Sequence, residues 1–156
     1  MKSLIVLFSY HHNNTQKIAE AMAKVLDAQV KTPQQTNPEE LQQYDLVGFG
    51  SGIDSDKHYQ VLLDFADQLP QYPNKKAFIF STCAMTGEGK PAKDHTALRE
   101  LLQPKGFRIL GEFQCLGFNT NGFLKYFGGM NKGRPNAEDL KHAEEFAQNL
   151  KQFAEN

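Results

Sequence analysis

Near its amino terminus the chain runs LIVLFSYHHNNTQKIA over residues 4–19. The apolar run Leu4–Phe8 predicts a buried strand, and the pattern from Gln16 to Leu26 predicts a helix. Small hydroxyl and amide side chains fill the turn between them. Backbone N–H groups at the start of a helix have no partner within the helix and carry partial positive charge, so they attract anions. The turn therefore predicts a binding site for a phosphate group.

Strand and helix patterns alternate along the rest of the chain. Continuous apolar character, typical of strands covered on both faces, marks Leu46–Gly50, Ala77–Phe80, Phe107–Phe118 and, more weakly, Ala28–Lys31. Apolar stripes at helical spacing lie in Val61–Leu69, Leu98–Leu102 and Leu140–Leu150, and helix starts are expected at Asn37 and Asn136. The alternation predicts a single α/β domain over residues 1–156, with a parallel sheet and helices on both faces.

Composition excludes several classes of protein. The 156 residues are 40% hydrophobic and 22% charged, which suits a globular domain with a real core. A net charge of -1 argues against nucleic acid or an anionic membrane as partner. No apolar run is long enough to span a bilayer, and Met1–Ser3 leads directly into the first strand, so a cytoplasmic protein is expected. The two cysteines are too few for a disulfide framework or a zinc site.

Three predicted strands end in loops of similar chemistry. These loops are Ser9–Thr15, Gly50–Asp56 and Ser81–Gly89, and they are small, rich in hydroxyl groups or contain glycine. In open parallel sheets the ligand lies outside the carboxyl ends of the strands. Small residues allow the backbone to approach a ligand closely. Together the loops predict a site for a flat polar ligand that carries a phosphate at one end.

With these loops in place, the chain resembles the flavodoxin family along essentially its whole length. The resemblance rests on a Ser-x-His-His-x-Asn-Thr pattern at Ser9–Thr15, on Gly117–Gly122 and on Lys132–Asn136. It implies a doubly wound five-stranded parallel sheet in the order 2-1-3-4-5 and FMN as the cofactor. The chain departs from many members in its near-neutral charge, in its lack of tryptophan and in having Asn13 where glycine is frequent.

The resemblance also implies which residues contact FMN. The first loop binds the phosphate, and the loops after the third and fourth strands flank the isoalloxazine ring. The implied ligands are Ser9, His11, Asn13, Asn14, Thr15, Ser51, Gly52, Ile53, Asp54, Ser81, Thr82, Cys83, Ala84, Met85 and Gly87. No residue is expected to act as a general acid or base or to bind a metal.

Several of these residues have a second interpretation. Ser9 and Thr15 can also cap the first helix, which is compatible with phosphate binding. Either at least one of His11 and His12 contacts the phosphate, or both are solvent-exposed loop residues. Cys83 is interpreted as a small lining residue, because no basic neighbour lowers its pKa. Tyr59 is expected to pack on a helix surface rather than to fold back over the site.

Two further features bear on the redox chemistry. A carboxylate at Asp54 or Asp56 beside the flavin is expected to lower its reduction potential. Residues 119–130 form a long glycine-rich and aromatic stretch, which is either a lid or partner surface or a satellite of the core.

The predicted function is that of an FMN-binding redox protein that transfers electrons. Its partner is a redox protein or a small electron donor or acceptor, and it is expected to be a monomer or a weak homodimer. One alternative is an NAD(P)H-dependent FMN or quinone reductase, which needs space beside the flavin for a second substrate. An alternative of another class is a module that binds a phosphate-bearing ligand without flavin.

Overall fold

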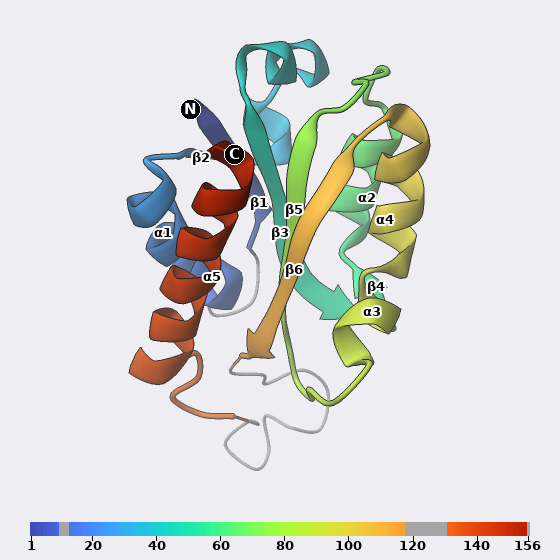
Figure 1. The fold of residues 1–156 in the computed structure, drawn as a ribbon. Coiled ribbons are helices and arrows are strands. Elements are labelled where there is room, and N and C mark those ends of the chain that lie inside the picture. The colour runs from blue at the N-terminus through green and yellow to red at the C-terminus, as the bar shows by residue number, and fades with distance from the viewer. Residues whose placement is uncertain (10–12, 118–130, 156) are drawn as a thin grey trace.

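A computed structural model describes residues 1–9, 13–117 and 131–155 (Figure 1). The helices and strands of these residues are, in chain order, β1 (Ser3–Phe8), α1 (Asn14–Leu26), β2 (Gln29–Lys31), η1 (Pro33–Gln35), η2 (Pro38–Gln43), β3 (Leu46–Asp54), β4 (Lys57–His58), α2 (Gln60–Asp67), β5 (Lys76–Cys83), α3 (Lys90–Asp94), α4 (Thr96–Leu102), η3 (Gln103–Lys105), β6 (Arg108–Leu116) and α5 (Ala137–Glu155). None of the described helices is both long and apolar enough to cross a membrane.

The described strands form one parallel sheet in the order β2-β1-β3-β5-β6. This order confirms the predicted arrangement 2-1-3-4-5, because β5 and β6 are the predicted fourth and fifth strands. The additional strand β4 is short and pairs antiparallel with the end of β3. The order in which successive strands join the sheet reverses between β1 and β3, since β2 lies on one side of β1 and β3 on the other. Ligands bind at such a point in open α/β sheets.

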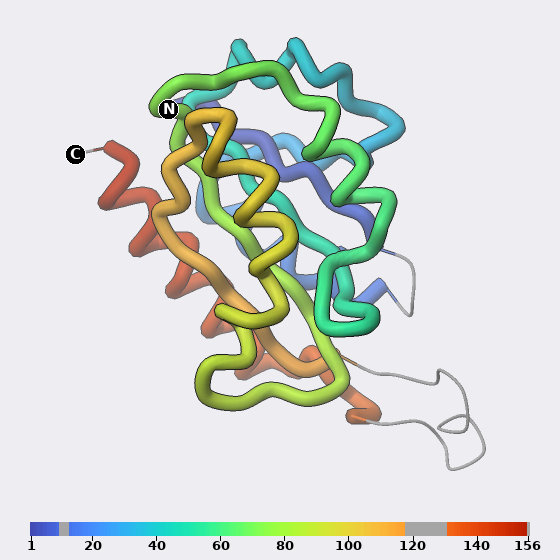
Figure 2. Tube along the Cα trace, turned by 90° about the vertical axis from the view of Figure 1, so that its right-hand side faces the viewer, coloured from blue at the N-terminus to red at the C-terminus, as the bar shows by residue number. Residues whose placement is uncertain are grey.

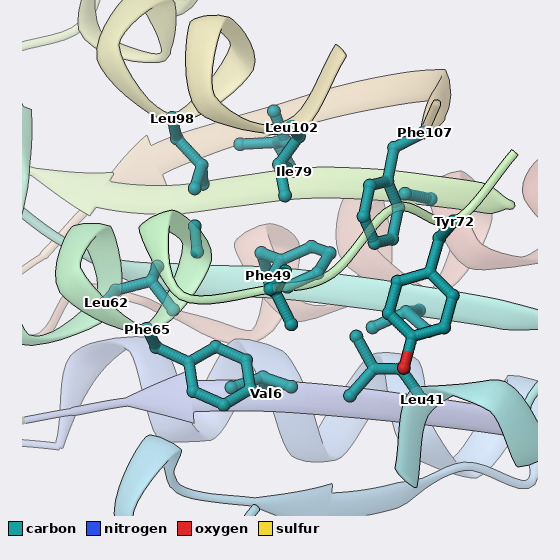
Figure 3. Packing of buried hydrophobic residues seen from close by; sticks show 14 of the residues in the cluster. Val6, Leu41, Phe49, Leu62, Phe65, Tyr72, Ile79, Leu98, Leu102 and Phe107 are labelled. Carbon is teal, nitrogen blue, oxygen red and sulfur yellow. The ribbon is translucent and has the colours of Figure 1, made fainter. Parts of the chain in front are cut away.

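Helices cover both faces of the sheet, with α1 and α5 on one side and α2 and α4 on the other (Figure 1). Successive side chains of a strand point to opposite faces. Leu4 and Val6 of β1 therefore join the core under α2 and α4, while Ile5 and Leu7 join the core under α1 and α5. Figure 3 shows the first of these cores, with Phe49 of β3 among the side chains from α2 and α4.

Glycine alternation in β3 makes room for large rings in β5. Gly48 and Gly50 pair with Phe78 and Phe80. A Cβ atom on either glycine would lie 2.2 Å from the ring of its partner. Both phenylalanines are fully buried, so the glycines let two aromatic side chains fill the core under α1 and α5.

The structure corrects the end of the third predicted strand. The third strand does not end at Gly50 but continues to Asp54 and returns through a turn at Ser55 and Asp56 into β4. The extension follows from pairing, because Gly52 still pairs with Thr82 of β5. Both turn residues have positive φ, 53° and 62°, which suits a tight antiparallel hairpin.

The two predicted helix starts are both used. Asn37 caps η2, which is a short 3₁₀ helix rather than an α-helix. Asn136 caps α5, since its side-chain oxygen accepts a hydrogen bond from the Asp139 N–H at 2.9 Å. The short helix α3 was not expected from the sequence, because it begins beside Gly89 and Pro91 and has no apolar stripe.

Candidate functional site

The carboxyl ends of the parallel strands meet at one end of the molecule. The β3–β4 hairpin and the β5–α3 loop both lie at this end (Figures 1 and 2). The N-terminus and the end of α5 lie at the opposite end (Figure 1). The three loops that the sequence pointed to therefore belong to one edge of the sheet.

The first loop leads into α1, and two of its residues shape the start of this helix. Asn13 has left-handed backbone torsions, with φ 54°, directly before the helix. Asparagine tolerates this conformation better than most residues, which explains how it replaces the frequent glycine. The Ser9 hydroxyl accepts a hydrogen bond from the Gln16 N–H at 3.3 Å, so it satisfies one free donor of the helix start. His11 and His12 lie outside the described residues.

A pair of hydroxyl groups joins this loop to the middle of the sheet. Thr15 Oγ1 lies 2.9 Å from Thr82 Oγ1, and both side chains are buried. Only one of the two hydroxyl hydrogens is used in the bond between them. The second hydrogen can be donated to an anion, which matches the chemistry of a phosphate ligand.

Close packing also joins α1 to the end of β6. A Cβ atom on Gly117 would lie 2.7 Å from Asn14 Nδ2, so only glycine fits beside this side chain. The Gly117 N–H donates to the Cys83 carbonyl at 2.9 Å. Asn131 Nδ2 donates to the Ala84 carbonyl at 2.7 Å. The ends of β5 and β6 are thus fixed to each other and to the first turn of α1.

The β3–β4 hairpin places the predicted ring-flanking residues. The Ser51 hydroxyl accepts a hydrogen bond from the Tyr59 N–H at 3.1 Å and donates to the Gly52 carbonyl. Ser51 therefore closes the base of the hairpin. Ile53 is half-buried and Asp54 is exposed, so both reach the outer end of the site.

The sequence suggested that Tyr59 packs on a helix surface, and the structure shows that this prediction is wrong. Its ring lies over Gly52, where a Cβ atom would approach the Tyr59 hydroxyl to 2.8 Å. The ring also meets Phe8 edge-on, with centroids 5.9 Å apart. Tyr59 precedes α2 and so folds back over the ends of β1 and β3, which local helical spacing could not show.

The β5–α3 loop combines a buried thiol with an exposed thioether. Burial raises the pKa of Cys83 to about 11, so the thiol stays protonated near neutral pH. Its Sγ donates to the Met85 carbonyl at 3.0 Å. The side chain of Met85 is 64% exposed. Gly87 is also exposed, and its carbonyl accepts a hydrogen bond from the Lys90 N–H.

The two acidic residues of the hairpin have different surroundings. Asp56 lies 3.4 Å from Lys93 and 3.9 Å from Lys90. Lys90 also pairs with the buried carboxylate of Asp94. Asp54 has no ion pair with any residue that the structure describes. The negative charge of Asp54 is therefore the less compensated of the two.

A largely buried network of polar side chains lies beneath this loop, and no local sequence pattern predicted it. Ser81 Oγ is 2.7 Å from His95 Nε2, and His95 Nδ1 is 2.8 Å from Glu112 Oε1. Arg99 holds both oxygens of Glu112, at 2.6 and 3.0 Å. Partial burial raises the pKa of Glu112, but the hydrogen bonds from His95 and Arg99 outweigh it and bring the pKa to about 2.

The hydrogen bonds among Ser81, His95 and Glu112 connect these residues as in a serine–histidine–acid catalytic triad. The serine and histidine side chains, however, are not accessible to a substrate. Ser81 and His95 are both 0% exposed. The Ser81 hydroxyl also accepts a hydrogen bond from Gln114 Nε2 at 3.1 Å. A nucleophile must reach its substrate, so the arrangement serves the inside of the protein rather than acyl transfer. Its members are 14 and 17 residues apart along the chain, a spacing that carries no local signal.

No group of three or more histidine, cysteine, aspartate or glutamate side chains in residues 1–9, 13–117 and 131–155 could hold a metal ion. The predicted cofactor ligands that the structure describes come from three loops at one edge of the sheet, with Thr15 and Thr82 in direct contact. Their contact with a cofactor stays a prediction.

Comparison with known proteins adds the following findings. The sequence pattern of a flavodoxin domain matches residues 5–154. An uncharacterized protein of Methanocaldococcus jannaschii is 46% identical over 153 residues, which cover 96% of this chain and 98% of that protein. Among solved structures, oxidised flavodoxin 2 of Bacillus cereus is 21% identical with a TM-score of 0.73, covering 97% of this chain and 99% of that one. A flavodoxin from the domain Archaea is 16% identical with a TM-score of 0.70 and full coverage of both chains.

Proposed function

This chain belongs to the flavodoxin family, and we propose from that premise that it binds FMN and transfers electrons between redox partners. Membership of the family supports a flavin as the cofactor. The bound flavin supplies the redox chemistry, since it takes up and releases electrons. The protein supplies binding, orientation and an electrostatic environment.

The observation that carries the proposal is the contact between Thr15 and Thr82. It brings the first turn of α1 to the end of β5, at the edge formed by the carboxyl ends of the parallel strands. A helix start with free N–H groups and a spare hydroxyl donor favours a phosphate monoester. Ser9, Asn13 and Asn14 complete this phosphate site, with His11 as a further proposed contact.

The proposed ring site lies between the β3–β4 hairpin and the β5–α3 loop. Gly52, Ile53 and Asp54 come from the hairpin, and Cys83, Ala84, Met85 and Gly87 come from the β5–α3 loop. Ser81 was expected among these contacts, but its side chain is 0% exposed and its hydroxyl is bonded to His95 and Gln114, so it is not proposed here. An aliphatic side chain such as Ile53 gives van der Waals contact but lacks the aromatic stacking energy of about 0.5–1.5 kcal/mol. We therefore expect FMN affinity to depend strongly on the phosphate.

Electron transfer is proposed ahead of a stand-alone reductase. Among the described residues, the hydrogen-bonded group of Ser81, His95 and Glu112 offers a substrate no accessible nucleophile or base, because Ser81 and His95 are both 0% exposed. The proposed partner is a redox protein or a small electron donor or acceptor, met by a monomer or a weak homodimer.

The first experiment is an absorbance spectrum of the purified protein before and after loading with FMN. Retained flavin with resolved one-electron steps on reduction is the expected result. Rapid consumption of NADH or NADPH without a partner protein would favour the reductase instead. Failure to retain either FMN or riboflavin, together with binding of inorganic phosphate, would favour a flavin-free phosphate module.

A matched pair of variants tests the carrying observation. Thr15→Val removes the hydroxyl that meets Thr82 and keeps the shape of the side chain. Thr96→Val removes a hydroxyl of α4 that bonds only the Ala92 carbonyl at 2.8 Å and serves as the control. A hydrogen bond to a charged group contributes about 1.5–3 kcal/mol, so Thr15→Val should weaken FMN binding at least tenfold and riboflavin binding little. Equal FMN affinity in both variants would remove Thr15 from the phosphate site.

A further inference from the structure

The β3–β4 hairpin is held on the sheet by a buried histidine. His58 lies in β4, which pairs only with β3 among the described strands. Its ring crosses to the next strand, where Nε2 donates to the Phe80 carbonyl of β5 at 3.0 Å. The side chain of His58 is 1% exposed. This bond therefore connects the hairpin directly to β5.

A second histidine fixes the other side of this ring. The rings of His58 and His95 lie 4.9 Å apart between centroids, with 41° between their planes. His95 joins α3 to α4 and is held at both nitrogens, by Ser81 and by Glu112. His58 is thus enclosed by β5 on one side and by a rigid, hydrogen-bonded ring on the other.

We propose that His58 and His95 form a latch that positions the β3–β4 hairpin, and with it Ile53 and Asp54, beside the flavin ring. This inference rests on the proposed function, because the flavin is what the hairpin would contact. His58 and His95 act here as positioning residues. The hydrogen bond between Ser51 and Tyr59 holds only the base of the hairpin, and the ion pairs of Asp56 at its tip lie at the surface, where such pairs contribute little.

The latch requires His58 to be neutral. Nε2 carries the proton donated to Phe80, and Nδ1 has no hydrogen-bond partner among the described residues. Burial, and next the neighbouring His95, lower the pKa of His58 to about 3. Asp94 of α3 and Glu112 of β6 act in the opposite direction but do not offset the burial.

The charges of those two acids are already used by other partners. Lys90 of α3 pairs with Asp94, and Arg99 of α4 pairs with Glu112. Once the hairpin opens and exposes His58, its pKa returns towards the ordinary 6.5. Below that pH, opening should become more favourable by up to about tenfold per pH unit.

Amide hydrogen exchange on the purified full chain tests the latch directly. The Tyr59 N–H, bonded to Ser51 at the base of the hairpin, reports hairpin opening. The Ile5 N–H, in the middle of the sheet, reports global opening. After correction for intrinsic rates, protection at Tyr59 should fall about 16-fold from pH 6.5 to pH 5. Protection at Ile5 should fall by a similar factor, because global unfolding also exposes His58, but it should stay well above that at Tyr59 at every pH. Equal protection at the two amides would mean that the hairpin opens only when the whole protein unfolds, which would overturn the latch.

Two variants and a control make this result specific. His58→Gln keeps an amide donor for the Phe80 carbonyl but takes up no proton, so Tyr59 protection should lose its pH dependence. His95→Gln removes the ring beside His58 and should speed Tyr59 exchange already at pH 7.5. His142→Gln alters a histidine on the surface of α5 and should behave like the unaltered protein. A pH dependence that persists in His58→Gln would contradict the proposal.

Flavin binding then tests the positioning role. We expect the dissociation constant of riboflavin to rise several-fold from pH 7.5 to pH 5, and to stay constant in His58→Gln. Riboflavin lacks the phosphate, so titration of the phosphate loop does not enter this comparison. The same pH profile in both proteins would overturn the positioning role. If neither riboflavin nor FMN binds at pH 7.5, the proposed function fails and the positioning role with it, while the exchange result still decides whether the latch exists.

Discussion

Ser81 and Thr82 are consecutive residues at the end of β5, and their hydroxyls serve opposite faces of the sheet. Thr82 meets Thr15 of α1 on one face. Ser81 meets His95, and through it Glu112 and Arg99, on the other. The first contact involves two neutral hydroxyls, whereas the second belongs to a chain of ionisable groups.

The difference separates binding from stability. A pair of hydroxyls at a helix start can turn one donor towards an anion without any change of charge. A buried chain that contains an ion pair must keep its partners, because a buried polar group without a partner is costly. We therefore expect changes on the Thr82 face to alter ligand affinity, and changes on the Ser81 face to alter folding and its dependence on pH.

Removal of the central histidine should have the largest effect. His95→Ala leaves a cavity and takes a partner from both Ser81 and Glu112, so the free energy of unfolding should fall by roughly 3 kcal/mol. Chemical denaturation at pH 7 measures this change. The exposed His142→Ala is the control and should change stability by less than about 0.5 kcal/mol. A similar small change in both variants would show that the Ser81 face contributes little to stability.

Acid should weaken the same face. Between pH 6.5 and pH 3 the unfolded chain binds a proton at His58 that the folded protein excludes, so stability falls as the pH falls through this range. From pH 7 to pH 5 this residue alone should cost about 2 kcal/mol. Denaturation curves at a series of pH values measure the slope. His58→Gln should flatten it, and an unaltered slope would mean that His58 is protonated in the folded state.

A pair of neighbouring variants separates the two faces most sharply. Thr82→Val should raise the dissociation constant of FMN about tenfold, with little effect on riboflavin, because a donor near the phosphate is lost. Ser81→Ala should lower stability and leave the ratio of FMN to riboflavin affinity unchanged. Fluorescence titration of both flavins gives the two ratios. A changed ratio in Ser81→Ala would mean that the two faces are coupled through β5.

The smallest effect is expected from the acidic residues of the β3–β4 hairpin, whose His58 packs on the same face of the sheet as Ser81. The effect is on the reduction potential of the bound flavin. Asp54→Asn should raise the reduction potential of the bound flavin by tens of mV, since it removes an exposed negative charge. Asp56→Asn should raise it less, because Lys90 and Lys93 already compensate Asp56. Redox titration of the two variants tests the order. The reverse order would place Asp56 nearer to the flavin than Asp54.

The sequence predicted what depends on near neighbours in the chain. Apolar runs located the parallel strands, and the resemblance of Ser9–Thr15 to a phosphate loop led to the family and the strand order. Local patterns were less reliable where pairing decides the outcome. The end of β3 is such a case. Three of its last four residues, Ser51, Gly52 and Asp54, have small or polar side chains, and this segment forms a strand through its partners on β1, β5 and β4.

Arg134 shows the same limit for a single side chain. Beside Pro135 its charge suggests a solvated residue before the last helix. In the structure its guanidinium forms two hydrogen bonds to Asp139, at 2.5 and 2.6 Å, and Asp139 is 5% exposed. These bonds lower the pKa of the Asp139 carboxyl although burial alone would raise it. The sequence shows that Arg134 and Asp139 are close along the chain. It does not show that Asp139 is buried, which is why the pair matters for stability.

By itself, the sequence determined the α/β class, the order of strands and helices, and the hydroxyl-rich turn before α1, because each depends on residues a few positions apart. Only the tertiary structure decided that Thr15 meets Thr82, that Tyr59 covers Gly52, and that His58 and His95 lie side by side. The partners in these contacts come from separate elements, and His58 and His95 are 37 positions apart. The packing of α2, α3 and α4 against the sheet brings them together. Polar groups are buried together in this way only when they find hydrogen-bond partners, and those partners come from distant parts of the chain.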